Sequence, residues 1–232
     1  MPGFTIHQLD ITTAGHWSFQ DSSLTWKHPT LGVGGRFDPF PAYPHDAGLA
    51  ADAAERVAEL CPPLYDIEIY LPNREETGRT NGYSTNHLPR RYVDGDWVTD
   101  PPVGLIVMSA KRIPPHPAMT RYLVGHEYGH HIAWMLGKLR GASHIQDTSW
   151  LTQYGELRRL PESAPLYGSG GNWHAAVEEI FACDFRVWLG IETEYWPHPG
   201  IPHPADVGSP TGDFRAWWID ALDQLRAAES IR

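Results

Sequence analysis

The sequence has few cysteines and no long apolar segment. Only Cys61 and Cys183 are present among 232 residues, which excludes a disulfide framework and a C-x-x-C motif. Two reduced, buried thiols are expected. No apolar run approaches the roughly 20 residues that a membrane-spanning helix needs. The first residues, Met-Pro-Gly-Phe-Thr-Ile-His, lack the charged and apolar regions of a secretory signal. A cytoplasmic location is therefore expected, and export by a signal-free route stays open.

Positive charge is also scarce. The chain has 18 Lys and Arg against 28 Asp and Glu, a net charge of −10. Nucleic acids and anionic membranes bind basic surfaces, so neither is expected as a partner. The hydrophobic fraction of 41% is enough for a core, and no repeat or linker divides the chain. The sequence thus predicts one domain over residues 1–232 and leaves the oligomeric state open.

Hydrophobic periodicity predicts a mixture of helices and strands. Residues 1–47, with several Gly and Pro, are expected to be irregular, although 4–11 alternate loosely enough for a strand. A hairpin is expected at 91–98, polar loops at 73–87 and 161–171, and a proline-rich loop with a C-terminal helix over 191–232. Helices are predicted at 48–60, 117–139, 148–159, 172–190 (with Asn172 as N-cap) and 212–228, and strands at 65–71 and 104–109.

The most informative motif is H-E-x-x-H, formed by His126, Glu127 and His130. On a helix, residues four apart share a face, so both imidazoles can reach one metal ion. Glu127 directly follows His126, so its side chain points to a different side of the helix from the two histidines. Its carboxylate can reach a metal-bound water and act as a general base. With 13 histidines in the chain, a helix with solvated histidines is the simpler interpretation. The segment 117–139 is apolar nearly all round, however, and two unpaired imidazoles in a buried helix would be costly.

A catalytic zinc site needs a third protein ligand besides a water. The predicted helix at 172–190 offers Glu178, Glu179 and Asp184 in an otherwise apolar segment. Glu179 shares its face with small residues, which would allow close approach to the first helix. Glu178 shares a face with Phe181 and Phe185. Spacing favours Glu179 without excluding the other two.

The two helices together resemble the short gluzincin metallopeptidases, and most closely the anthrax lethal factor-like peptidases. The similarity rests on His126-Glu127-x-Gly129-His130 and on Glu179-Ile-Phe-Ala-Cys-Asp-Phe185, and it covers about residues 104–190. It implies that Glu179 is the third zinc ligand. It also implies that a tyrosine before this glutamate donates to the oxyanion, a role that falls to Tyr167 of Tyr167-Gly168. The family often has an acidic residue four positions after the ligand glutamate, where this chain has Cys183.

Other histidines and Cys183 have alternative roles. His174 is a second candidate oxyanion donor, although a histidine in a first helical turn is more often structural. His131 points about 100° away from His130 on the helix and is expected to pack or cap. Cys183 is a weaker candidate for a zinc ligand than a carboxylate.

The expected fold is α+β and zincin-like, with a small mixed sheet packed on the helix of His126 and His130, and a second helix carrying Glu179. The strand 104–109 is expected to be the edge on which an extended peptide lies. The expected activity is that of a zinc-dependent endopeptidase with Glu127 as base and a peptide or protein as substrate. The alternatives are a non-catalytic protein in which zinc ties two helices together, and a hydrolase of a non-peptide amide.

Overall fold

The computed structural model describes residues 2–11, 18–20, 23–28, 34–77, 81–144, 146–168, 170–196, 200–201, 203 and 212–228. Helices and strands alternate irregularly along these segments, and the strands form small sheets rather than one doubly wound sheet. The α+β class expected from the sequence is therefore confirmed.

The main sheet has four strands in the order β1-β5-β10-β7, which are Phe4–Leu9, Ile67–Pro72, Val103–Met108 and Gly82–His87. The first three are parallel, and β7 runs antiparallel to β10. Two expectations are wrong here. Segment 73–87 is not a polar loop, because it contains β7 and the short β6 (Arg74–Glu76). The strand at 104–109 is not an edge, because β10 lies between β5 and β7.

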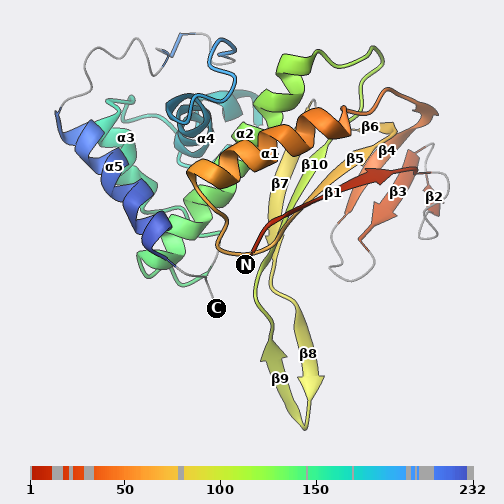
Figure 1. The fold of residues 1–232 in the computed structure, drawn as a ribbon, viewed down its shortest axis with the longest axis horizontal. Helices are drawn as coiled ribbons and strands as arrows, with labels where there is room; N and C mark the ends of the chain where they lie inside the picture. Colours follow the sequence, from red (N-terminus) through yellow and green to blue (C-terminus); the bar gives the residue numbers. More distant parts are fainter. Residues whose placement is uncertain are drawn as a thin grey trace.

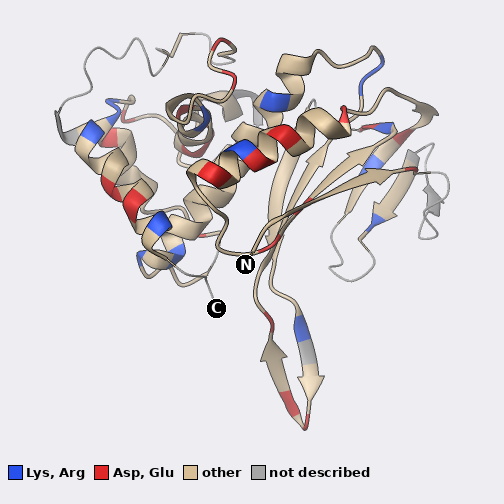
Figure 2. Ribbon diagram, viewed as in Figure 1, with Lys and Arg blue, Asp and Glu red and all other residues tan. Residues whose placement is uncertain are grey.

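Helices α1 (Ala47–Leu60) and α2 (Pro117–Leu139) cover one face of this sheet (Figure 1). Ile69 and Ile106 of the sheet belong to the same buried core as the apolar residues of both helices. The outward face of α1 carries acidic residues (Figure 2). Helix α2 starts with Pro117, as expected, and the His116 side chain accepts from the Ala118 N–H as its cap. This helix is the buried centre of the fold.

Helix α4 (Val177–Trp188) packs directly on α2. The contact is close because a glycine faces an alanine: a Cβ at Gly129 would lie 2.6 Å from the Ala182 Cα. No side chain fits at this crossing, so Gly129 is required between the two motif histidines. The short helix α3 (Leu151–Leu157), the 3-10 helix η1 (Gly170–Ala175) and α5 (Gly212–Ala227) complete this helical side.

The helix predicted at 172–190 begins later than expected. Residues 170–175 form η1, and Ala176, in extended conformation, is the N-cap of α4. Asn172 is therefore not the cap. The expected helices at 48–60, 117–139 and 212–228 agree with α1, α2 and α5 within one or two residues. Most of the predicted proline-rich loop at 197–210 lies outside the described residues.

A second sheet covers the other face of the main sheet. Its antiparallel strands are β2 (Ser18–Gln20), β3 (Ser23–Lys27), β4 (Gly34–Pro41) and β6, in the order β2-β3-β4-β6. Trp26 and Phe37 are buried with Tyr70 and Leu105 of the main sheet. The expectation of an irregular 1–47 is thus wrong. A Cβ at Gly34 would lie 1.9 Å from the Trp26 carbonyl oxygen, so this glycine permits close strand pairing rather than a loop.

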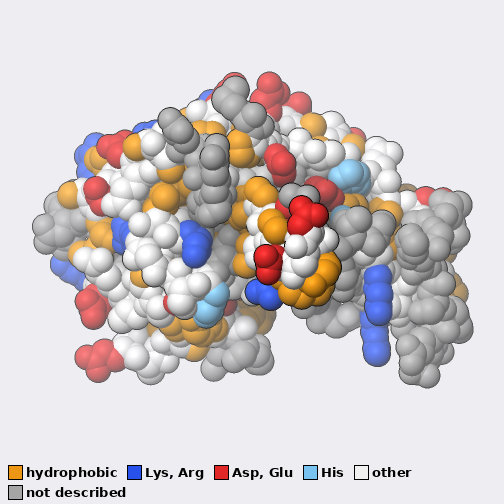
Figure 3. Space-filling model, turned by 90° about the horizontal axis from the view of Figure 1, so that it is seen from below, with side chains coloured by type: hydrophobic (Ala, Val, Ile, Leu, Met, Phe, Trp, Pro, Cys, Tyr) orange, Lys and Arg blue, Asp and Glu red, His pale blue; other side chains and the backbone are white. Residues whose placement is uncertain are grey.

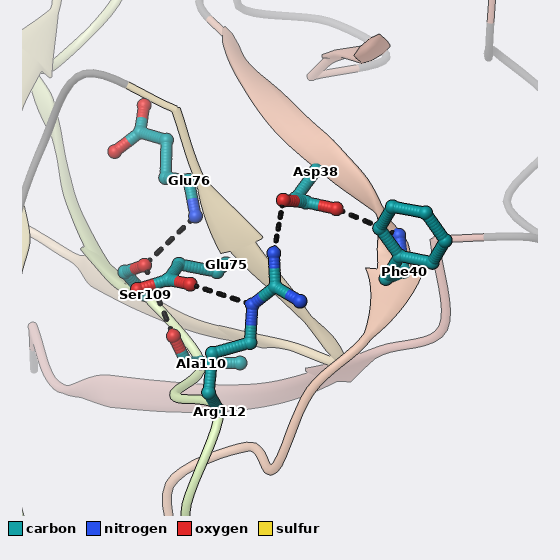
Figure 4. A network of polar contacts seen from close by, with 7 residues as sticks. All are labelled: Asp38, Phe40, Glu75, Glu76, Ser109, Ala110 and Arg112. Carbon is teal, nitrogen blue, oxygen red and sulfur yellow. Dashed lines mark hydrogen bonds and ion pairs between the residues drawn. The ribbon is translucent and has the colours of Figure 1, made fainter. Parts of the chain in front are cut away.

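Polar contacts join the second sheet to the end of β10 (Figure 4). Arg112 pairs with Asp38 of β4 and, at 3.1 Å, with Glu75 of β6. The Ser109 hydroxyl accepts from the Glu76 N–H at 2.8 Å. These contacts fix the segment that leads from β10 into α2.

Strands β8 (Arg90–Val93) and β9 (Asp96–Thr99) form a hairpin that projects from the body (Figure 1). Asp94 and Gly95 have φ values of 51° and 95°, as a two-residue hairpin turn requires. The predicted hairpin is therefore confirmed. Figure 3 looks onto its end, where Tyr92 and Trp97 are exposed. Among the described helices, none is long and apolar enough to cross a membrane.

Candidate metal centre

Three predicted ligands from two helices meet at the α2–α4 crossing. His126 and His130 are one turn apart on α2, and Glu179 lies in the first turn of α4. The Glu179 Oε2 atom lies 3.2 Å from His126 Nε2 and 3.6 Å from His130 Nε2. One ligand atom from each residue falls within 4.8 Å of the others. This spacing and the N, N, O donor set fit a divalent metal such as zinc.

The imidazole of His126 is held by Cys183 on its other side. The Cys183 sulfur lies 3.2 Å from His126 Nδ1, which leaves Nε2 directed at Glu179. The Tyr122 ring stacks on His126 at 5.4 Å, and its hydroxyl lies 3.8 Å from the same sulfur. Cys183 therefore occupies the position where the family that the motifs resemble often has an acidic residue, and it contacts the candidate ligand His126 without belonging to the candidate ligand group.

Electrostatics in the centre favour a cation. Burial lowers the pKa of both His126 and His130. At His126 the neighbouring Cys183 raises it and Glu179 adds to this, whereas at His130 Glu179 raises it, so both pKa values lie above the usual value. Burial raises the pKa of Glu179, but the two histidines lower it more, and the net shift is downward. The two histidines thus lie in a negative potential, to which Glu179 contributes and which a bound dication would use.

Glu127 is buried beside the three ligands but is not one of them. Burial raises the pKa of its carboxyl, while the two histidines and a hydrogen bond with Ser84 of β7 lower it, and the net shift is upward. A Cβ on Gly82 would lie 3.7 Å from Glu127 Oε1, which shows how closely β7 approaches this carboxylate. Glu127 is therefore placed between the ligands and the sheet edge, where a general base would be needed.

The centre lies in a cavity of about 630 Å³. The start of β7 forms one wall, with Gly82, Tyr83 and Ser84. Within the described residues, the other edge of β7 pairs with no strand. The remaining lining comes from α2, from η1 with its preceding loop, and from α4. The volume is within the range of small-molecule and peptide-side-chain sites.

Glu178 also lines this cavity, which the sequence pattern did not indicate. Its Oε1 accepts from the Gly168 N–H at 2.8 Å. Asp184, the third acidic candidate, is instead fully buried away from the ligands, where it pairs with Arg158 at 2.7 Å and accepts from Tyr154. The helix therefore directs its three carboxylates to three different surroundings.

The tyrosine and histidine candidates have different positions. The Tyr167 side chain is 47% exposed and does not line the cavity, although the backbone of its neighbour Gly168 does. His174 lies in η1 and is also not among the lining residues. The oxyanion role of Tyr167 stays a prediction. His131 is buried, with Nδ1 2.9 Å from the Tyr65 hydroxyl and Nε2 3.3 Å from the Leu105 carbonyl oxygen, as a packing residue.

The contact between Cys183 and His126 leads to a first testable prediction. Cys183→Ala removes the partner of His126 Nδ1, so the imidazole loses its fixed orientation. We expect the affinity for zinc to fall by about 10- to 100-fold, the usual effect of losing such a partner. The measurement is competition with a chelator of known affinity. Cys61→Ala is the matched control, because Cys61 is a buried thiol outside the centre. Equal zinc affinities of Cys183→Ala and Cys61→Ala would mean that Cys183 contributes packing and does not orient His126.

No family model, no curated protein and no solved structure matches the chain.

Proposed function

We propose that this chain is a zinc-dependent endopeptidase of the gluzincin type with a zincin-like fold. The observation that carries the proposal is the joint position of His126, His130, Glu179 and Glu127 in one cavity, beside a strand edge that pairs with no other strand in the described part of the chain. Two histidines and a carboxylate with an adjacent free carboxylate form the donor set and base of zinc hydrolases. The resemblance of the two helix motifs to the gluzincins points the same way.

A zinc ion held by His126, His130 and Glu179 would supply a Lewis acid and lower the pKa of a water. Glu127 is the proposed general base, because its carboxylate lines the cavity and lies outside the candidate ligand group; it would take a proton from the attacking water and deliver it to the leaving amine. Tyr167 is the proposed donor to the developing oxyanion, which requires its exposed side chain to turn into the cavity.

Strand β7 is the proposed seat of the substrate backbone. An extended peptide can add to its outer edge through main-chain hydrogen bonds, as in other strand-addition complexes. Tyr83 and Ser84 of β7 line the cavity, so a peptide on this edge would pass beside Glu127. This role replaces the one that the sequence pattern gave to 104–109.

The non-catalytic alternative is less well supported. Structural zinc sites are closed by four protein ligands, whereas the group found among the described residues has three. The three ligands also line an open cavity rather than a sealed core. A helix-tying zinc would not need Glu127 at its side.

Metal removal tests the proposal. Purified protein should hold one zinc per chain and hydrolyse members of a broad library of internally quenched peptides. Dialysis against a strong chelator should abolish the cleavage, and one equivalent of zinc should restore it, because the ligands alone cannot activate water. Mass spectrometry of the products gives the cleaved bond. A zinc-replete protein that cleaves no peptide of the library would contradict the proposal.

A further inference from the structure

The cavity has more negative charge than the proposed reaction uses. Its lining contains the carboxylates of Glu127, Glu178 and Glu179 and, among the residues that the structure describes, no Lys or Arg. In the proposed reaction Glu179 is a metal ligand and Glu127 is the general base. A bound dication compensates two of the three charges. Glu178 is therefore left with a charge that neither the metal nor the reaction needs.

Glu178 is held in place rather than free to turn away. The Gly168 N–H donates to its Oε1 at 2.8 Å, so the loop before η1 fixes the carboxylate. Glu178 makes no ion pair with a Lys or Arg among those found in the described segments. The side chain is only partly buried and lines the cavity, so a group that enters from solvent can reach it.

An aromatic side chain accompanies this carboxylate. Trp173 of η1 lines the same cavity and is 39% exposed. It adjoins the same glycine that binds Glu178: a Cβ on Gly168 would lie 3.3 Å from the Trp173 Cβ. A carboxylate and an indole that border one space are both favourable neighbours of a cation.

We propose that Glu178 binds a positively charged group of the substrate, so that a protonated amine or guanidinium near the scissile bond is preferred. The inference rests on the proposed peptidase function and names its substrate class. A Lys or Arg side chain and a free amino terminus have the same chemistry. A neutral side chain would leave the carboxylate without a cationic partner, which predicts a preference of about 10- to 100-fold in kcat/KM.

Matched peptides test this preference. A cleaved peptide is resynthesised with lysine or norleucine at each position around the scissile bond, with a free or an acetylated amino terminus. We expect a lysine-to-norleucine ratio in kcat/KM of about 10 to 100 at one position, falling close to 1 in Glu178→Gln. Glutamine keeps the acceptor for Gly168 and loses only the charge. If the preference instead follows the free terminus and is lost in the same variant, the ligand is the α-amine.

The control is Glu156→Gln, which removes an exposed carboxylate on α3 outside the cavity lining and should keep the wild-type ratio. The inference is overturned, with the peptidase proposal intact, if the lysine-to-norleucine ratio and the free-to-acetylated ratio are both near 1 in wild type, or if neither ratio falls in Glu178→Gln.

A binding measurement separates the two proposals. The α-N-acetylated hydroxamates of lysine and norleucine are titrated into zinc-loaded protein in a calorimeter. Tighter binding of the lysine compound to wild type, lost in Glu178→Gln, supports the cation site even if no peptide is cleaved. If wild type binds both compounds equally, Glu178 does not bind a lysine side chain. Norleucine hydroxamate with a free α-amine is then compared with its acetylated form, to test whether Glu178 binds the α-amine instead. If the free-amine compound binds no more tightly than its acetylated form, the inference fails.

Discussion

Replacement of Glu127 by glutamine should abolish peptide hydrolysis while zinc stays bound. Glutamine has the same size and can still bond with Ser84, but it cannot take a proton. General-base catalysis contributes about 10²- to 10⁴-fold, so kcat should fall by at least about 10²-fold. The ligands His126, His130 and Glu179 are unchanged, and zinc per chain should remain at one. Quenched-peptide kinetics and metal analysis of the same sample give both numbers.

The control for Glu127→Gln is a variant that removes a carboxylate outside the site. Glu156→Gln serves because its side chain is exposed on α3 and outside the cavity. It should retain wild-type kinetics, which also shows that the preparation carries no contaminating peptidase. Undiminished hydrolysis by Glu127→Gln with full zinc would exclude this residue as the base and would require another group in the cavity.

Helix α2, which carries the two histidines of the candidate site, could be predicted from sequence because several independent signals agree there. Pro117 marks its start, the apolar residues continue on all sides, and Gly137 and Gly141 mark its end. The helix spans Pro117–Leu139, as expected. The i, i+4 spacing of His126 and His130 then fixes their common face. Helical periodicity is local, so no knowledge of the partner elements was needed.

The edge strand could not be predicted in the same way. Its sequence, Gly-Tyr-Ser-Thr-Asn-His, is polar, and most of its side chains are only partly buried. Its strand conformation depends on pairing with β10 from Val103 to Met108, a contact between segments distant in sequence. Burial of Asn86 within this strand gives no local signal either. Polar edge strands are specified by the sheet they join, and a pattern of alternating hydrophobic residues does not reveal them.

The candidate site also has one part that local sequence spacing predicts and one part that depends on the surrounding structure. Spacing could select the face of α4 that carries Glu179 and Cys183, because residues four apart share a side. It could not place Glu178, whose apolar neighbours Phe181 and Phe185 suggested a core position. The carboxylate lines the cavity because α4 begins only at Val177, after η1, and the Gly168 N–H binds it there. Where a helix starts depends on the preceding loop, which the residues of the helix do not encode.

The two adjacent glutamates of α4 should differ sharply when each is changed to glutamine. Glu179 has an oxygen 3.2 Å from His126 Nε2 and 3.6 Å from His130 Nε2, within the ligand group. Glu178 bonds with the Gly168 N–H instead. Glu179→Gln replaces a charged ligand of a dication by a neutral one, so zinc should be lost on dialysis against a weak chelator. Glu178→Gln should keep one zinc per chain.

Stability provides a second measure of the same difference. A zinc ion held by His126, His130 and Glu179 would join α2 to α4 at a crossing already tightened by Gly129 and Ala182, so its binding energy would stabilise the folded chain. At a free zinc concentration of about 1,000 times Kd, the gain in unfolding free energy is about 4 kcal/mol. Wild type and Glu178→Gln should show this rise in Tm on adding zinc, whereas Glu179→Gln and His130→Ala should show little of it. Loss of the zinc-dependent shift in Glu178→Gln, with its retention in Glu179→Gln, would mean that the neighbouring carboxylate is the ligand and that α4 is turned by one residue from the register described.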